Sequence, residues 1–196
     1  MFINKGLQEI NLKIVYYGPG LSGKTTNLEY IYHKLDPTIR SDLVSLKTRE
    51  ERTLYFDFMQ LELGRIKGKK PRFNLYTVPG QVQYSFSRKI ILRGVDGLVF
   101  VADSQRERMT DNLDSLLDLE KNLIDMGHSL QNFPWVIQYN KRDLPNIEPL
   151  QRLQASLNFF GTSHTEAIAS QGVAVLTTLK MVISAVISQM DVLVKQ

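Results

Sequence analysis

The sequence has 196 residues, a formal net charge of +4 and no cysteine. A chain of this length suits one domain, over residues 1–196, with a core large enough to fold without cross-links. Without cysteine it has no disulfide bond, thiolate metal site or cysteine nucleophile. We also expect a soluble cytoplasmic protein without a lipid anchor, because no cysteine can be acylated or prenylated and Phe2 stands where myristoylation needs glycine.

The excess of basic residues does not indicate nucleic-acid binding. The densest basic stretch comprises Arg65, Lys67, Lys69, Lys70 and Arg72, and no aromatic residue is interleaved among them for stacking on bases. We interpret this stretch as a solvated hairpin turn, and an acidic partner or a membrane surface is the alternative. No nucleic-acid partner is expected.

Strand and helix patterns alternate along the chain. Strands are predicted at 12–17, 54–63, 72–78, 98–102, 135–139 and 166–168, and helices at 25–35, 106–126 and 171–195. The second and third strands flank a turn rich in glycine and lysine, which is typical of an antiparallel hairpin. This order predicts an α/β fold, a mostly parallel central sheet with one antiparallel edge strand and helices on both faces. Ligands of such sheets bind beyond the carboxyl ends of the strands.

The residues directly after the first strand match the phosphate-binding pattern GxxxxGK(S/T). They read GPGLSGKT, and a helix pattern follows. Glycines allow backbone N–H groups to surround a phosphate, Lys24 reaches the β- and γ-phosphate oxygens and supports catalysis, and Thr25 ligates Mg²⁺. The predicted nucleotide contacts in this stretch are Gly18, Gly20, Leu21, Ser22, Gly23, Lys24, Thr25 and Thr26.

A second motif, NKRD, follows the fifth predicted strand. The carboxylate of Asp143 can accept hydrogen bonds from N1–H and the 2-amino group of guanine, which adenine does not offer. Asn140 would meet the other edge of the base, and the stem of Lys141 would cover its face. A backbone N–H near Ala169 could reach the base carbonyl, and Ala167 has a comparable claim. The nucleotide is therefore predicted to be GTP or GDP.

With these motifs the chain resembles the small GTPases of the Ras superfamily over residues 12–179. Within that superfamily it is similar to the bacterial MglA family, which sets cell polarity for gliding and twitching motility; the matching blocks are YYGPGLSGKTTNL, ERTLYFDF, RFNLYTVPGQV, SRKIILRGVDGLVFVADS and VIQYNKRDLP. The resemblance implies a small-GTPase P-loop fold, Mg²⁺-dependent GTP hydrolysis and a cycle between GTP and GDP states. It also implies a dimeric roadblock-fold activating protein of the MglB type and motility or polarity effectors. The chain alone would be a monomer, and protein partners would recruit it to a cell pole.

The resemblance also assigns roles to residues of two nucleotide-sensing segments. Thr53 matches the threonine that closes over Mg²⁺ and the γ-phosphate, and Arg52 matches a built-in arginine finger, with Arg49 as the second candidate. Gln81 matches the glutamine that orients the attacking water, and the N–H of Gly80 would contact the γ-phosphate. From the residues alone, Arg52 could equally be a solvated arginine of a mobile loop.

One position departs from the wider superfamily. Thr77 stands where most members carry a carboxylate, and MglA proteins share the threonine. Because a hydroxyl is a poorer acceptor for Mg²⁺-bound water, we expect weaker metal binding or recruitment of another acid, with Asp57 and Asp103 as candidates. Capping of the next turn is the competing role of Asp103. The threonine also leaves open an alternative function, a nucleotide-loaded adaptor that does not hydrolyse GTP.

Overall fold

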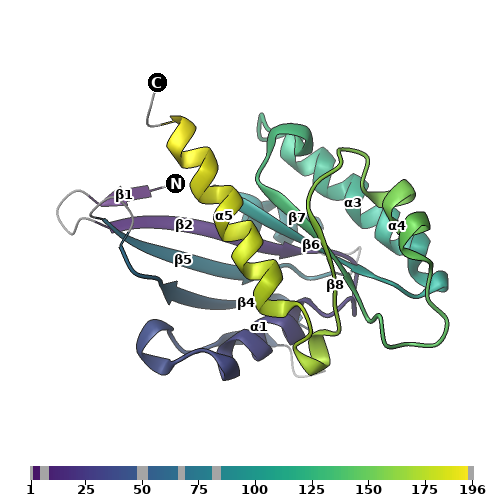
Figure 1. Ribbon diagram of the computed structural model, residues 1–196. Coiled ribbons are helices and arrows are strands. Elements are labelled where there is room, and N and C mark those ends of the chain that lie inside the picture. Colours follow the sequence, from purple (N-terminus) through teal and green to yellow (C-terminus); the bar gives the residue numbers. More distant parts are fainter. Residues whose placement is uncertain (1, 5–8, 48–52, 66–68, 81–84, 194–196) are drawn as a thin grey trace.

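The computed structural model describes residues 2–4, 9–47, 53–65, 69–80 and 85–193. Within these ranges one sheet forms the centre, with strand order β3-β4-β5-β2-β6-β7-β8 and with β1 paired to β2 (Figure 1). The strands are β1 (Phe2–Asn4), β2 (Glu9–Tyr17), β3 (Val44–Lys47), β4 (Thr53–Glu62), β5 (Lys70–Thr77), β6 (Gly97–Asp103), β7 (Trp135–Asn140) and β8 (His164–Glu166).

The larger part of the sheet is parallel. β2 pairs in parallel with β5 and β6, and the parallel pairing continues through β7 to β8. β4 runs antiparallel to both β3 and β5, and β1 runs antiparallel to β2. The predicted fold class and hairpin are confirmed. The structure adds β1 and β3, which have only 3 and 4 residues and are too short to show a sequence pattern.

The basic stretch joins β4 to β5, as the hairpin interpretation expects. The guanidinium of Arg72 pairs with the carboxylates of Glu9 at 3.0 Å and Glu62 at 2.9 Å. Part of the basic charge is therefore neutralised within the sheet. Lys67 lies outside the described residues.

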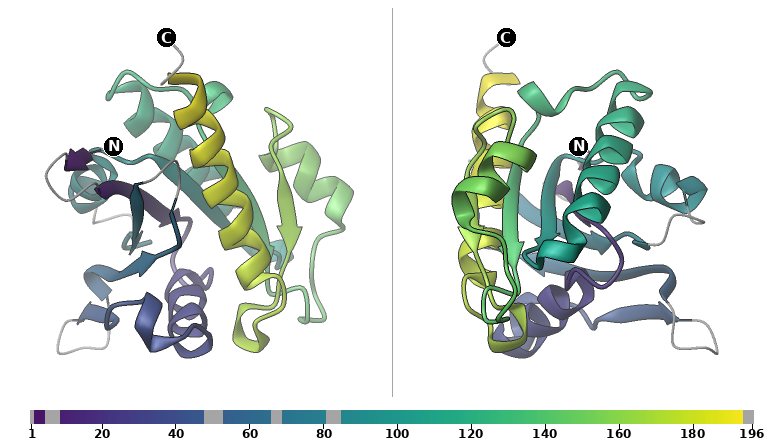
Figure 2. Two further views of the ribbon diagram at one scale, coloured as in Figure 1. Left: turned by 60° about the vertical axis from the view of Figure 1, so that its left-hand side comes forward. Right: turned by 90° about the vertical axis from the view of Figure 1, so that its right-hand side faces the viewer.

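The α-helices of the described residues are α1 (Lys24–Lys34), α2 (Ser85–Leu92), α3 (Met109–Ile124), α4 (Leu150–Leu157) and α5 (Val175–Leu193). α1 and α5 pack on one face of the sheet, and α2, α3 and α4 pack on the other (Figure 2). Side chains alternate along β2, so that Leu12, Ile14 and Tyr16 belong to the first core and Val15 and Tyr17 to the second. β6 is buried along its whole length, as a central strand requires. None of the described helices is long and apolar enough to cross a membrane.

The last two elements differ from the prediction by a few residues. The last strand is His164–Glu166 rather than 166–168, because its pairing with β7 runs from Ile137 opposite His164 to Tyr139 opposite Glu166. The last helix begins at Val175 rather than at 171, since Gly172 and Ala174 have φ angles of 76° and 58° that interrupt a right-handed helix. α2 and α4, of 8 residues each, lie outside the helices predicted from the sequence.

Candidate active site

The carboxyl ends of the parallel strands meet at one edge of the sheet, and the predicted motifs follow them. The phosphate loop follows β2, Gly80 follows β5, Asn140 ends β7 and Ala169 lies just beyond β8. Ser22 and Asn140, 118 positions apart in the sequence, are in hydrogen-bond contact here. The fold therefore assembles the predicted nucleotide motifs at one place.

The phosphate loop has a shape that only glycine permits at two positions. Gly18 has a φ of 141°, and a Cβ there would lie 2.2 Å from the carbonyl oxygen of Val101 in β6. Gly23 has a φ of 102°, and a Cβ there would lie 2.2 Å from Nδ2 of Asn140. The loop thus packs directly on β6 and on the second motif. Leu21 also has a positive φ, of 64°, and its side chain is 86% exposed.

The side chain of Lys24 is buried beneath the phosphate loop. Its ammonium donates hydrogen bonds to the carbonyl oxygens of Gly18 at 2.9 Å and Pro19 at 2.7 Å. Burial is the largest cause that lowers the pKa of Lys24 to about 7; the positive charges of Arg88 and Arg108 act in the same direction, and the carboxylate of Asp57 opposes them. A polyanion that approaches such a site stabilises the charged form of the ammonium. This agrees with the predicted role of Lys24 as a phosphate contact.

Asn140 cross-links the phosphate loop to the loop beyond β8. Its Nδ2 donates to the carbonyl oxygen of Ser22 at 2.8 Å, and its Oδ1 accepts from the N–H of Ala169 at 2.9 Å. The N–H of Ala167 donates to the carbonyl oxygen of Tyr139. Both backbone N–H groups considered for the base therefore have protein partners, and their contact with a base stays a prediction.

Two other residues of the NKRD motif, Lys141 and Asp143, have different surroundings. Lys141 has a φ of 64°, and its ammonium lies 2.6 Å from the buried carboxylate of Asp103. Asp103 also accepts from the N–H of Gln105 at 3.1 Å, which is the turn cap weighed for it above. Asp143 is exposed, as a carboxylate that receives a base requires.

Asp57 lies beneath the phosphate loop, in contact with Thr25 and Thr77. Its Oδ2 accepts from the hydroxyl of Thr25 at 2.6 Å and from the hydroxyl of Thr77 at 2.9 Å, and the N–H of Asp57 donates to the Thr77 oxygen at 2.8 Å. Ser45 donates to its second oxygen, Oδ1. A buried carboxylate therefore stands beside the threonine predicted to ligate Mg²⁺, and oxygen donors of this kind suit that ion. Of the two candidate acids, Asp57 occupies this place and Asp103 does not.

Gly80 lies on top of the phosphate loop. A Cβ on this residue would be 2.3 Å from the nitrogen of Gly20 and 2.5 Å from the carbonyl carbon of Pro19. The close approach of two backbones explains the need for glycine here. The predicted contact of the Gly80 N–H with a γ-phosphate stays a prediction.

The remaining residues assigned by resemblance are only partly described. Thr53 begins β4 and pairs with Lys47 of β3. Arg49, Arg52 and Gln81 lie outside the described residues. The catalytic roles of Arg52 and Gln81 therefore stay predictions.

A buried polar network behind the phosphate loop was not predicted from the sequence. Nδ2 of Asn27 in α1 donates to the carbonyl oxygen of Gly23 at 2.9 Å and to Oε1 of Gln138 at 2.7 Å. Nε2 of Gln138 in β7 donates in turn to the hydroxyl of Thr178 in α5 at 3.0 Å. The sequence feature that could have indicated this network is Gln138, a polar residue in the middle of a mostly apolar strand.

A second unpredicted contact connects α2 to the start of the phosphate loop. The guanidinium of Arg88, which is buried, pairs with the carboxylate of Asp118 in α3 at 2.9 Å. The same carboxylate accepts from the hydroxyl of Tyr17, the residue directly before Gly18. The helix that follows Gln81 is thus fixed to α3 and β2.

A recess of about 450 Å³ lies beside Ala169, one of the residues predicted to contact the base. Its lining includes Thr26, Tyr30 and Leu43 on one side and Ala169 and Ser170 on the other. The recess therefore lies between α1 and the loop beyond β8, and its lining includes Thr26, a predicted nucleotide contact.

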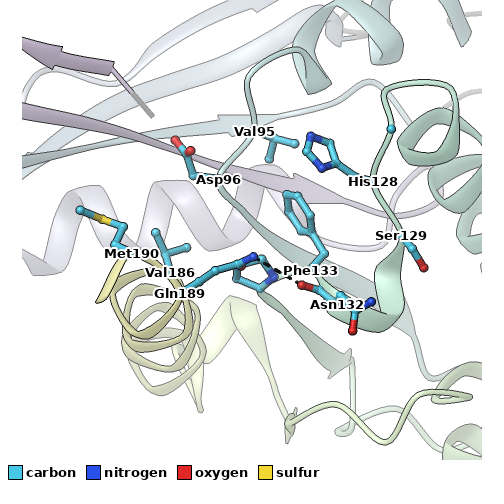
Figure 3. Close-up of a pocket in the computed structure, with 11 residues that line it drawn as sticks. Val95, Asp96, His128, Ser129, Asn132, Phe133, Val186, Gln189 and Met190 are labelled. Atoms are coloured by element: carbon cyan, nitrogen blue, oxygen red, sulfur yellow. Dashed lines mark hydrogen bonds between the residues drawn. The ribbon is translucent and has the colours of Figure 1, made fainter. Parts of the chain in front are cut away.

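Another hollow, of about 440 Å³, lies at the opposite end of the sheet (Figure 3). It is lined by residues that include Val95, His128, Phe133, Val186 and Met190. Because Val95 and Phe133 precede β6 and β7, the hollow faces the amino ends of these strands. It is separate from the motifs described above.

Comparison with known proteins agrees with this site. A model of the ADP-ribosylation factor family matches residues 1–196. The chain belongs to this family of small GTPases. It is also 54% identical to the mutual gliding-motility protein MglA of Myxococcus xanthus over 189 residues, which cover 96% of this chain and 97% of that protein. The resemblance to MglA proteins noted in the sequence is confirmed.

As a small GTPase, the chain binds and hydrolyses GTP. Among the described residues, no group of three or more histidine, aspartate or glutamate side chains could hold a metal ion. Mg²⁺ takes many of its ligands from phosphate oxygens and water. Asp57 and Thr25 are the side chains of the described site that fit it.

Proposed function

We propose that the chain is a single-domain GTPase, over residues 1–196, that switches cell polarity and motility according to its nucleotide. The observation that carries this proposal is the contact of the phosphate loop with Asn140, which joins the phosphate and base motifs in one site. The likeness to a Myxococcus xanthus protein named for gliding motility supports the biological role. A cytoplasmic protein recruited to a cell pole fits this role.

Catalysis in this proposal consists of positioning and charge stabilisation. Lys24 and the backbone N–H groups of the phosphate loop hold the β- and γ-phosphates, and the N–H of Gly80 meets the γ-phosphate. Gln81 orients the attacking water. Arg52 neutralises charge that develops in the transition state, so that the chain carries its own arginine finger. Closure of the two sensing segments would bring these groups together.

Magnesium in this site would neutralise charge on the β- and γ-phosphates. Thr25 and Thr53 would be its protein ligands. Asp57 would accept hydrogen bonds from its water ligands, because its buried carboxylate already contacts Thr25 and Thr77, and Thr77 stands where most members of the wider superfamily carry an acid. Asp103 does not compete for this role, since Lys141 holds its carboxylate.

Replacement of Asp57 by asparagine is expected to raise the Mg²⁺ concentration needed for tight GDP binding by about 10- to 100-fold, the usual effect of losing a partner of a metal ligand. The amide keeps the shape of the side chain but loses the negative charge. The measurement is the release of mant-labelled GDP as a function of free Mg²⁺. An Asp57→Asn, Thr77→Asp double variant should recover part of the loss.

The matched control for this prediction is Asp103→Asn. Loss of the Asp103 carboxylate should weaken nucleotide binding equally with and without Mg²⁺, because this carboxylate pairs with the ammonium of Lys141. An Asp57→Asn variant whose Mg²⁺ midpoint equals that of the wild type would contradict the assignment.

The proposed regulator is a dimeric activating protein of the MglB type. The resemblance to MglA proteins supports this partner, and motility or polarity effectors would bind the GTP form of the monomeric chain. The test begins with the nucleotide that the purified protein carries and continues with phosphate release, with and without the activating protein. Guanine nucleotide and stimulated release are expected, whereas bound GTP that is never hydrolysed would favour the adaptor function left open by Thr77.

A further inference from the structure

Two cationic side chains, Lys24 and Arg108, donate hydrogen bonds to carbonyl oxygens of the phosphate loop, and only Lys24 has a role in the proposed mechanism. Burial lowers the pKa of Lys24 most, and the positive charges of Arg88 and Arg108 lower it as well. Arg88 is engaged with Asp118. Arg108 is different, because it contacts the phosphate loop itself.

Arg108 ends a short 3₁₀ helix, Arg106–Arg108, directly before α3. Its Nη2 donates to the carbonyl oxygen of Gly20 at 2.7 Å, and its Nη1 lies 2.5 Å from the carboxylate of Asp111. The side chain is 28% exposed. A planar guanidinium with two fixed contacts is held in one orientation.

Arg108 contacts the phosphate loop at Gly20, the residue that also lies close to Gly80. Gly80 approaches the nitrogen of the same residue from the segment predicted to sense the γ-phosphate. The orientation of the peptide units on either side of Gly20 determines which groups of the loop face a bound phosphate. Arg108 therefore holds the loop where the sensing segment meets it.

The same arginine is connected to the base-reading side of the site. Its Nε lies 3.9 Å from the carboxylate of Asp103, which also receives Lys141 of the NKRD motif. The carboxylate of Asp103 therefore lies between two cationic side chains, Arg108, which contacts the phosphate loop, and Lys141 of the NKRD motif. Both ends of a bound nucleotide would be supported through this buried carboxylate.

We propose that Arg108 is a positioning residue for the terminal phosphate of GTP, acting through the carbonyl of Gly20 and through its own positive charge. The proposal rests on the proposed GTPase function and adds a residue that makes the loop discriminate GTP from GDP. GTP carries one more phosphate than GDP at the end of the nucleotide where Gly20 and Gly80 meet. Loss of the arginine should therefore affect GTP more than GDP.

The test compares the affinities of wild-type protein and Arg108→Ala for a mant-labelled, non-hydrolysable GTP analogue and for mant-GDP. The dissociation constant of the GTP analogue should rise by about tenfold and that of GDP by less than about threefold, the loss expected for one charge-assisted contact. Single-turnover hydrolysis at saturating GTP should also slow. Arg108→Lys should restore part of the GTP affinity, because an ammonium keeps the charge but lacks the planar fork that reaches Gly20 and Asp111 together.

Arg106→Ala is the matched control, since Arg106 lies in the same short helix, is exposed and donates to the carbonyl of Ile147 instead. It should leave both affinities unchanged. An equal fall of GTP and GDP affinity in Arg108→Ala, or no change in either, would overturn the role of Arg108. Failure of the wild-type protein to bind or hydrolyse GTP would overturn the proposed function instead.

Discussion

Replacement of Gln81 by leucine or of Arg52 by alanine is expected to slow stimulated GTP hydrolysis by about 10³- to 10⁵-fold while leaving GTP binding nearly unchanged. Neither side chain is needed to hold the nucleotide, because the phosphate loop and Lys24 do so. Both act on the transition state, the glutamine by orienting water and the arginine by neutralising charge. Such losses lower the rate at saturating substrate and spare affinity.

The measurement is single-turnover phosphate release in the presence of the activating protein, together with the dissociation constant of mant-GTP. Gln83→Leu, the same substitution two positions further along, is the control for Gln81. Arg49→Ala tests the second candidate for the arginine finger. Weakened GTP binding in either principal variant would contradict the assigned roles, and a normal rate in Arg52→Ala with a loss in Arg49→Ala would transfer the finger to Arg49.

Much of the fold follows from local patterns of residues, and its deviations have local causes. β2 and β6 are runs of apolar and β-branched residues that read as strands in any context, and both are confirmed. The start of α5 is set instead by the positive φ angles of Gly172 and Ala174, which hydrophobic periodicity does not encode. A Cβ on Gly172 would collide with the ring of Tyr30, so the turn depends on a partner 142 positions earlier in the chain.

The site, like the fold, has parts that follow from local sequence patterns and parts that depend on contacts between distant residues. The phosphate loop and the NKRD motif are continuous stretches whose spacing expresses their chemistry, so they could be found directly. The contact of Asp57 with Thr77 depends on the pairing of β4 with β5, in which Phe58 faces Tyr76, and a pattern along the chain does not fix that register. Arg108 belongs to no motif, and only the packing of α3 beside the loop brings it to Gly20.

The structure gives Asn140 contacts that the sequence did not predict. Its amide contacts both Ser22 and Ala169, so it joins the phosphate loop to the loop beyond β8. Lys141 is likewise committed at its ammonium to Asp103. We therefore propose that the selection of guanine depends most on Asp143, whose carboxylate is exposed.

An Asp143→Asn variant is expected to lose about 10²-fold or more in affinity for GDP and to gain affinity for XDP, the xanthine analogue. In the proposed site the carboxylate of Asp143 would accept hydrogen bonds from N1–H and from the 2-amino group of guanine. Asparagine offers one acceptor and one donor, and its donor faces the guanine amino group without a partner, which costs the pairing energy of a buried polar group. Xanthine carries a carbonyl oxygen at that position, so the amide of asparagine can pair with both N1–H and the new acceptor.

The measurement is the ratio of dissociation constants for mant-GDP and mant-XDP in wild-type protein and in the variant. Inversion of the ratio separates base reading from general damage, because an unfolded or weakened site would lose both nucleotides together. Asp114→Asn, the same substitution at an exposed position of α3, should leave the ratio unchanged. An Asp143→Asn variant that keeps the wild-type preference would place the base-reading carboxylate elsewhere, whereas rescue by XDP would tie the identity of the nucleotide to this one side chain.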